Sequence, residues 1–186
     1  MIADLYEIRK SSRYGKGQFA TQFVPKGTID VFRCAKCGAY SKEEFAKLPK
    51  KERDFVVSHE VMNEDGLYSK FCDKRMQYDN HSCDANTLSV GGVFGIVVSD
   101  IKKGEEATSD YRQNEEEIHF AGGCMCGGKN CMGRSTFKPP ASKKIQSFWN
   151  RRISAALKRI PYVKQPLKRQ LLKEHPELSY YFKKSK

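Results

Sequence analysis

Residues 80–86, with the sequence NHSCDAN, bring two amides, an imidazole, a hydroxyl, a thiol and a carboxylate into one short loop. Surface loops are ordinarily polar, so the heptad alone does not separate a plain loop from a ligand-binding segment. All of these groups form hydrogen bonds, and the imidazole and the thiol also bind soft metal ions. What the heptad does therefore depends on which other segments of the chain meet it.

The composition limits the protein to one hydrophobic core with a small appendage, because the chain has 186 residues of which 39% are hydrophobic. No run of about 18 apolar residues is present, so we expect no membrane span. The first residues lack a basic segment followed by an apolar one, so we expect no secretory signal. The seven cysteines are an odd number and three of them are tightly spaced. This pattern favours an intracellular zinc site over a secreted disulfide framework.

The positive charge is concentrated at the C-terminal end of the chain. Residues 138–186 contain 14 Lys/Arg and two Asp/Glu, whereas the first 137 residues contain 20 of each. The net charge of +12 therefore comes entirely from the tail. A boundary near Pro139 and Pro140 fits this change, since a proline pair stops regular structure.

Short strands dominate the predicted body, and the fold class is mainly β with minor α. The runs that are typical of strands and turns are 5–9, 23–32 and 88–107. Residues 41–57 are predicted to be helical, with Ser41 as the N-cap and Glu44 three residues later, and with Pro49 as a break.

The tail contains an amphipathic helical pattern. Its apolar face is formed by Ile145, Phe148, Trp149, Ile153, Ala156, Leu157 and Ile160. Its basic residues, mostly on the other face, are Arg151, Arg152, Lys158 and Arg159. Two interpretations stay open. The helix docks on the body with a solvated basic face, or that face also binds a polyanion.

The strongest local signal for metal binding is Cys124-x-Cys126-x4-Cys131 in a glycine-rich segment. Three thiolates this close can wrap a soft divalent ion such as zinc. A structural zinc site closes with four ligands, so one more must come from Cys83, Cys34, Cys37, Cys72 or a histidine. Cys34-x2-Cys37 also has metal-ligand spacing, but for a lone pair we favour packed or solvent-exposed thiols.

Five blocks occur in a characteristic order. They are RKSSRYGKGQFAT (9–21), VPKGTI (24–29), NHSCDAN (80–86), SDIKKGEEATSDY (99–111) and CMCGGKNCMGR (124–134). Together they resemble the SET-domain protein lysine methyltransferases followed by the cysteine-rich post-SET module. The resemblance covers residues 3 to about 137. It implies a SET-domain fold of short strands with a pseudoknot over residues 1–118, and a post-SET zinc-binding segment over residues 119–137. Residues 138–186 then form a basic helical C-terminal extension.

The resemblance gives the heptad three roles. Asn80 and His81 would bind S-adenosyl-L-methionine. Cys83 would supply the fourth thiolate of a structural Zn²⁺ site, whose other ligands are Cys124, Cys126 and Cys131. The heptad would also form part of the pseudoknot, in which the stretch ending at Tyr111 passes beneath a loop. On this interpretation, the heptad contains so many polar and metal-binding groups because it binds both a cofactor and a metal.

The resemblance also implies that the turn of Lys16, Gly17 and Gln18 approaches the cofactor and that Tyr111 is the catalytic tyrosine. Methyl transfer from a sulfonium to an amine needs the amine lone pair, so the substrate lysine must be neutral. With a lysine pKa of ~10.4, deprotonation near pH 7 costs roughly 4–5 kcal/mol. A narrow apolar channel favours the neutral amine, and positioning does most of the remaining work.

Four positions depart from the family pattern: Asp79, Ala85, Ala107 and Ser109. Ser109 stands where many members carry Phe or Tyr lining the substrate lysine channel. A serine there leaves a wider channel, in which a methylated amine can rotate and present its lone pair again. We therefore predict di- or trimethyllysine as the end product. The alternative is that another side chain, such as Tyr6 or Tyr78, refills the space beside Ser109.

The implied partners are a protein substrate with an accessible lysine, such as a histone tail, and DNA or a nucleosome through residues 141–186. In a eukaryote, such a protein would act in the nucleus on chromatin. Two other function classes stay open. One is a non-catalytic, zinc-stabilised SET-like binding module, against which the presence of Tyr111 and Asn80 argues. The other is a nucleic-acid-binding protein that acts only through its basic tail.

Overall fold

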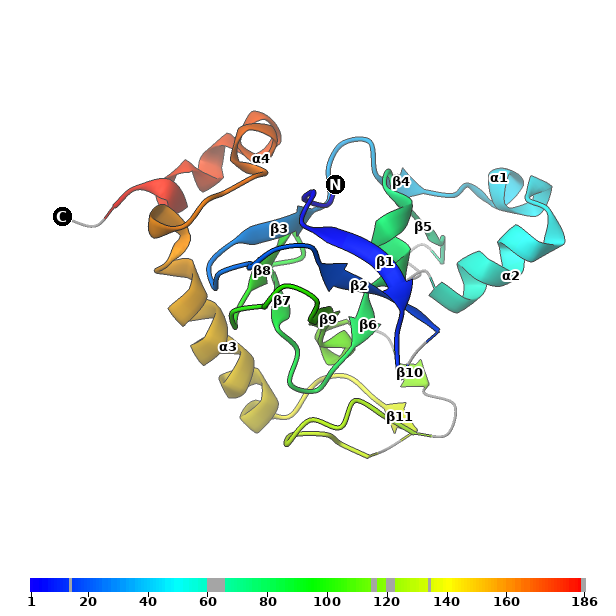
Figure 1. The fold of residues 1–186 in the computed structure, drawn as a ribbon. Coiled ribbons are helices and arrows are strands. Elements are labelled where there is room, and N and C mark those ends of the chain that lie inside the picture. The colour runs from blue at the N-terminus through cyan, green and yellow to red at the C-terminus, as the bar shows by residue number, and fades with distance from the viewer. Residues whose placement is uncertain (14, 60–65, 115–116, 120–122, 134, 185–186) are drawn as a thin grey trace.

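The computed structural model describes residues 1–13, 15–59, 66–114, 117–119, 123–133 and 135–184. A seven-stranded sheet lies at its centre, with the strand order β1-β2-β9-β7-β8-β3 and with β6 paired to β9 (Figure 1). Its strands are β1 (Tyr6–Lys10), β2 (Lys16–Ala20), β3 (Ile29–Phe32), β6 (Asn80–His81), β7 (Thr87–Val90), β8 (Phe94–Val97) and β9 (Glu106–Ser109). Two small ribbons pair β4 (Gly38–Ala39) with β5 (Ser69–Lys70), and β10 (Ile118–His119) with β11 (Thr136–Phe137). The central sheet agrees with the predicted β-rich body.

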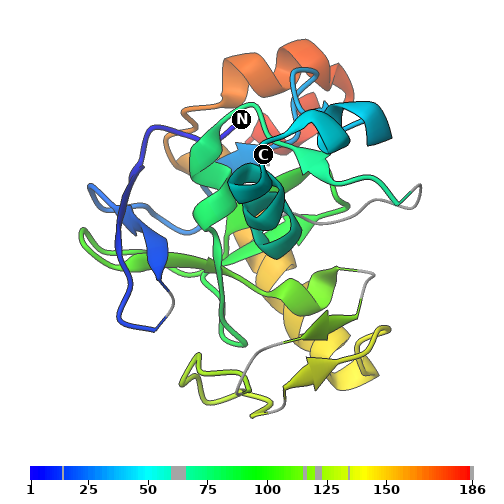
Figure 2. The same ribbon diagram turned by 90° about the vertical axis from the view of Figure 1, so that its right-hand side faces the viewer.

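Helices flank the sheet on two sides. The α-helices are α1 (Lys42–Lys47), α2 (Lys50–His59), α3 (Lys143–Leu157) and α4 (Lys168–Glu174). The 3-10 helices are η1 (Lys74–Tyr78), η2 (Tyr111–Gln113), η3 (Ile160–Tyr162) and η4 (Pro176–Phe182). Helices α1 and α2 lie on one side of the sheet and α3 on the other, as Figure 1 and the turned view of Figure 2 show. Within the described ranges, no helix has the length and apolar composition needed to cross a bilayer.

The predicted helix start at Ser41 is confirmed. The Ser41 hydroxyl accepts a hydrogen bond from the Glu44 N–H at 3.0 Å, and the Glu44 carboxylate accepts one from the Ser41 N–H at 2.9 Å. This reciprocal capping box satisfies two backbone donors that a helix leaves unpaired. The predicted break at Pro49 is confirmed as well, because α1 ends at Lys47 and α2 begins at Lys50.

Strand β9 connects segments that are distant in the sequence. It pairs with β2 in the antiparallel direction and with β6 and β7 in the parallel direction. In its parallel pairing, His81 lies opposite Ser109. The heptad of residues 80–86 is thereby fixed next to the segment that leads to Tyr111. The predicted pseudoknot also requires that this segment pass beneath a loop, and that threading stays a prediction.

The C-terminal extension packs into the same hydrophobic core as the sheet. Its buried contributors are Ala141, Trp149, Ala156, Ile160, Leu167 and Leu171. The other apolar residues of the predicted stripe also pack against this core. Gly27 shows how closely the body and the extension pack against each other. Its φ is +95°, and a Cβ there would lie 2.5 Å from the Arg159 Cβ. Only glycine fits such a turn without strain.

Polar contacts fix the extension in register with the body. The Trp149 indole N–H donates a hydrogen bond to Asp110 at 2.8 Å. The Gln165 side chain accepts from the Ile29 N–H at 2.9 Å and donates to the Gly27 carbonyl at 2.7 Å. The predicted docking of the amphipathic helix is therefore confirmed. The last two residues of the predicted basic tail, 185 and 186, lie outside the described residues.

Candidate functional site

A cavity of about 930 Å³ opens beside the central sheet. This volume is typical of small-molecule sites, which measure roughly 300–1,000 Å³. Five of the residues that the sequence singled out for cofactor binding, the lysine channel or catalysis line it: Lys16, Gln18, Asn80, Ser109 and Tyr111. They come from three segments that are far apart in the chain. The sheet pairings of β2, β6 and β9 bring those segments together.

Gly17 is not among the residues that line this cavity, although its neighbours Lys16 and Gln18 are. A Cβ at this position would lie 1.9 Å from the Glu106 carboxylate and 2.7 Å from the Asn80 amide nitrogen. That amide nitrogen donates hydrogen bonds to the Lys16 carbonyl at 2.9 Å and to Glu106 at 2.6 Å. A glycine is therefore needed for β2 to pass this close to Asn80. The predicted contact of Gly17 with the cofactor stays a prediction.

The buried His81 side chain is not among the residues that line the cavity, and it contacts Cys83. Its Nε2 lies 3.3 Å from the Cys83 sulfur, and its Nδ1 accepts a hydrogen bond from the Tyr111 N–H at 3.1 Å. Burial lowers the pKa of His81 to about 4, so the ring is neutral. Because Nδ1 is the acceptor, the single ring proton belongs on Nε2. His81 thus positions the Tyr111 backbone, while its predicted contact with a cofactor stays untested.

Four metal-binding groups meet within 4.8 Å of one another: His81, Cys83, Cys124 and Cys126. The sulfurs of Cys83 and Cys124 are 3.8 Å apart. This distance matches the edge of a tetrahedron with Zn–S bonds of about 2.3 Å, which is about 3.8 Å. Burial raises the pKa of the Cys83 thiol above its usual value, and a bound metal cation would offset this effect by favouring the thiolate. The cluster therefore fits a zinc ion.

The predicted fourth ligand, Cys131, borders this cluster. Its sulfur lies 3.4 Å from the Cys124 carbonyl oxygen, and its side chain packs against the three buried thiols. His81 is the competing ligand, but a proton on its Nε2 would leave no lone pair there for a metal. The hydrogen bond at its Nδ1 therefore favours Cys131 as the fourth ligand.

Asp84 joins the heptad to the cysteine-rich loop. Its carboxylate accepts a hydrogen bond from the Asn130 N–H at 3.0 Å. A Cβ on Gly128 would lie 2.5 Å from the same carboxylate. The glycine-rich composition between Cys126 and Cys131 therefore lets the loop fold over the heptad.

Tyr111 begins η2 at the mouth of the cavity. Its hydroxyl donates a hydrogen bond to the backbone carbonyl of Asp79, and its ring centroid lies 5.3 Å from that of His81. The neighbouring Ser109 hydroxyl is 2.9 Å from the Thr87 hydroxyl. The predicted catalytic tyrosine and the predicted channel residue thus face one cavity, and both are fixed by hydrogen bonds.

The carboxyl groups of the buried Asp30 and the partly buried Asp79 also line the cavity, and the sequence assigned a role to neither. Burial raises the pKa of Asp79 to about 7, against the lowering effect of a hydrogen bond from Ser109. Burial raises the pKa of Asp30 to about 6, although Tyr6 donates a hydrogen bond to it at 2.7 Å. The other oxygen of Asp30 has no hydrogen-bond partner among the described residues. The sequence signal for Asp79 was its departure from the family pattern. Asp30 was only an acid within an apolar run.

Comparisons with known proteins give similarities in structure and none in sequence. No protein-family model matches the sequence, and no curated protein matches it significantly. One similar solved structure is the crystal structure of a Plasmodium falciparum "putative histone methyltransferase". It is 19% identical to this chain with a TM-score of 0.41, and the match covers 59% of this chain and 95% of that one. A similarity this low leaves the function to be argued from the residues themselves.

Proposed function

We propose that this protein transfers methyl groups from S-adenosyl-L-methionine to lysine side chains of a protein substrate. The observation that carries this proposal is the lining of the cavity. Lys16 and Gln18, Asn80, and Ser109 with Tyr111 come from three separate sequence blocks and line the same cavity. The resemblance to SET-domain enzymes implies functional roles for these residues, and their common location supports those roles.

The cavity fits the cofactor in size and in charge. Gly15 lines it, and a Cβ there would meet nothing within 4 Å, so the backbone is open to a ligand. Asp30 and Asp79 also line it, and a cationic ligand would favour their ionised forms. When bound, the cofactor supplies an electrophilic methyl group on a positively charged sulfur. The substrate is a cation as well until its ammonium group loses a proton.

The residues of this chain would deprotonate and orient the amine. Burial raises the pKa of Asp79 to about 7, which makes its carboxylate a better proton acceptor than an ordinary aspartate, and desolvation of the ammonium group in the channel would lower the remaining cost of the transfer. The Tyr111 hydroxyl and the Asp79 carbonyl form one hydrogen-bonded unit that can fix the direction of the amine. No covalent intermediate with the protein is needed.

Zinc would act structurally. Cys83 belongs to the heptad, whereas its proposed partners Cys124, Cys126 and Cys131 belong to the post-SET segment. A metal shared between them would fix the cysteine-rich loop beside β6 and β9. It would also fix His81, and through it the backbone of Tyr111. Zinc would take no direct part in methyl transfer.

The test is radiolabelled methyl transfer to core histones and to a cell lysate, followed by mass spectrometry of the modified site. Tyr111→Phe removes only the hydroxyl and should lower turnover about 100-fold or more while leaving the fold intact. Tyr162→Phe is the matched control, because Tyr162 is 54% exposed and lies outside the cavity lining. If labelling is absent although a titration shows cofactor binding, the non-catalytic binding module is the better interpretation.

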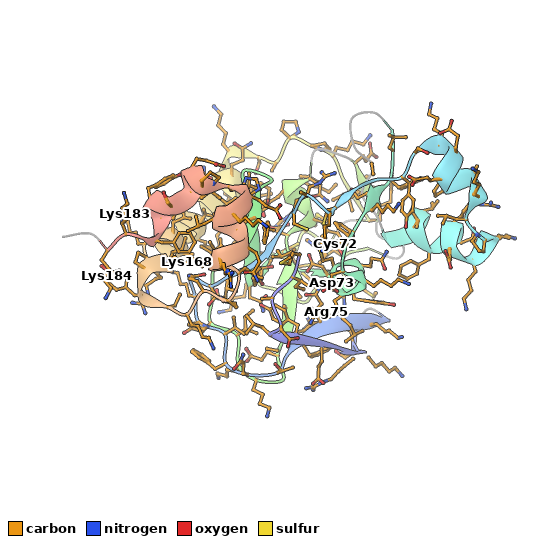
Figure 3. The ribbon with its side chains drawn as sticks, turned by 90° about the horizontal axis from the view of Figure 1, so that it is seen from above. Cys72, Asp73, Arg75, Lys168, Lys183 and Lys184 are labelled. Carbon is orange, nitrogen blue, oxygen red and sulfur yellow. The ribbon has the colours of Figure 1, made fainter. Side chains whose placement is uncertain are left out.

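A second proposal concerns the extension. The apolar stripe of the extension packs against the core, whereas Arg151, Lys158 and Arg159 are exposed. Further along, the exposed side chains of Lys168, Lys183 and Lys184 gather at the C-terminal end; we call them the C-terminal lysine cluster (Figure 3). We propose that these cations bind nucleic-acid phosphates, as on a nucleosome, while the cavity acts on a protein tail.

A further inference from the structure

Three more thiols meet outside the site described above. The sulfur of Cys72 lies 3.3 Å from that of Cys34 and 3.3 Å from that of Cys37. The sulfurs of Cys34 and Cys37 are 3.7 Å apart. All three cysteines are unpaired thiols, and together they form a second group with metal-binding geometry. None of them belongs to the cluster around Cys83.

The local fold explains why these residues meet. Cys34 and Cys37 flank a turn in which the Cys37 N–H donates a hydrogen bond to the Cys34 carbonyl at 2.8 Å. Cys37 immediately precedes β4, and one residue separates Cys72 from the end of β5. The antiparallel pairing places Gly38 opposite Lys70, so the start of β4 meets the end of β5. A cysteine pair in a tight turn with a third cysteine across a short ribbon is a suitable arrangement for a soft metal ion.

The distances fit zinc better than they fit other uses of the thiols. Three mutual contacts of 3.3–3.7 Å are close to the tetrahedral edge of about 3.8 Å for zinc thiolates. A disulfide would join two sulfurs and leave the third without a partner. Cys34 is buried whereas Cys72 is exposed, so an ion can enter from solvent. The Met1 nitrogen lies 3.9 and 3.8 Å from the Cys34 and Cys37 sulfurs, and the Met76 sulfur lies 3.6 Å from that nitrogen.

We propose that Cys34, Cys37 and Cys72 bind a second zinc ion as thiolates, with the fourth coordination position filled from solvent. Helices α1 and α2 are inserted between β4 and β5, and the metal would fix the base of that insertion. Figure 3 shows Cys72 between the C-terminal helices and the α1–α2 pair.

The proposed ion would also stiffen one wall of the cavity. Phe55 of α2, Phe71 next to Cys72, and Met76 of η1 all line the cavity. Their positions depend on the segment that the metal would fix. This role is structural and does not depend on the proposed methyl transfer, so the metal can be tested without an activity assay.

Metal content of the full chain, purified without chelators and measured by elemental mass spectrometry, tests the proposal. We expect two zinc ions per wild-type chain. Cys72→Ser and Cys126→Ser should each retain one ion, and the double variant should retain none. Lys36→Ser is the matched control, because Lys36 is an exposed residue inside the same turn, and it should retain two. A wild-type chain with one ion, whose content Cys72→Ser does not lower, would overturn the proposal.

A second measurement keeps the proposal testable if Cys72→Ser does not fold. Cys126→Ser protein, expressed with cobalt in place of zinc, should still show thiolate-to-cobalt charge-transfer absorption from the remaining site. Its absence in soluble Cys126→Ser protein would count against the site. So would an intact mass of the wild type, measured without reductant, that is lower by two hydrogens, with the disulfide mapped to Cys72. That result would show that two of the three cysteines form a disulfide and that the third remains a free thiol.

Discussion

Replacing Asp79 with asparagine should stabilise the protein more at pH 8 than at pH 5, relative to the wild type. Asp79 is a partly buried residue, and the desolvation of its carboxyl group raises the pKa from the ordinary 3.8 to about 7. In the unfolded chain the group ionises near its ordinary pKa. The stability that the neutral carboxyl contributes is therefore fully present below about pH 4 and is lost as the pH rises through 7.

The size of the effect follows from the shift. Each pKa unit corresponds to about 1.4 kcal/mol. Between pH 5 and pH 8 the wild type should lose about 3 kcal/mol that Asp79→Asn does not lose, because asparagine does not ionise. The free energy of unfolding, measured by urea denaturation at pH 5 and pH 8, should show this difference between the two proteins. An effect of the substitution that does not depend on pH cancels in this comparison. The titration of the cysteines cancels as well, because both proteins contain them.

Asp4→Asn is the control, since the side chain of Asp4 is fully exposed at 100%. Its difference from the wild type should be the same at both pH values. If Asp79→Asn also differs from the wild type by a constant amount, Asp79 does not titrate in this range and the reasoning about its environment is refuted. The proposed role of Asp79 as a proton acceptor would then lose its basis.

Three further predictions concern the metal, the product and the extension. Cys131→Ser should remove one zinc ion per chain, whereas His81→Gln should retain it, as measured by elemental mass spectrometry; the reverse result would make His81 the ligand. Ser109→Tyr should restrict the product toward monomethyllysine on a single-lysine peptide at long reaction times, and a wild type that stops at one methyl would contradict the wide channel. Alanine at all three positions of the C-terminal lysine cluster should weaken DNA binding and flatten its salt slope by about 3, one for each lost phosphate contact. An unchanged slope in a filter-binding series would show that this surface does not bind DNA.

Local patterns predicted local structure well. The capping box at Ser41 and the break at Pro49 depend on residues within one turn of each other, so the sequence alone specifies them. The apolar stripe that contains Trp149 and Ile160 was predicted for the same reason, because helical periodicity marks the face that must be buried. The partner of that face, β7 and β8, was not predictable from periodicity.

The parts of the site that sequence reasoning missed depend on tertiary burial. Asp30 is one acid in a strand, and its raised pKa arises only because the fold encloses it. The pairing of Cys72 with the Cys34-x2-Cys37 turn required β4 and β5 to be adjacent, and neither two-residue strand has a sequence signal of its own. The choice between His81 and Cys131 as the fourth metal ligand depends on a hydrogen bond from the Tyr111 backbone. The sequence pattern does not reveal this bond.

Trp149 gives the protein a built-in optical reporter. It is the single tryptophan in the chain, the residue is 8% exposed, and its indole N–H donates to the carboxylate of Asp110. Asp110 directly precedes Tyr111 and also accepts two hydrogen bonds from the guanidinium group of Arg112. Selective excitation therefore samples one indole, at the junction between the extension and the cavity. Its emission should move to longer wavelength if the extension leaves the sheet and water reaches the ring. Ligand entry beside Tyr111 should change its intensity while the ring stays buried, so undocking and binding can be followed separately without any attached dye.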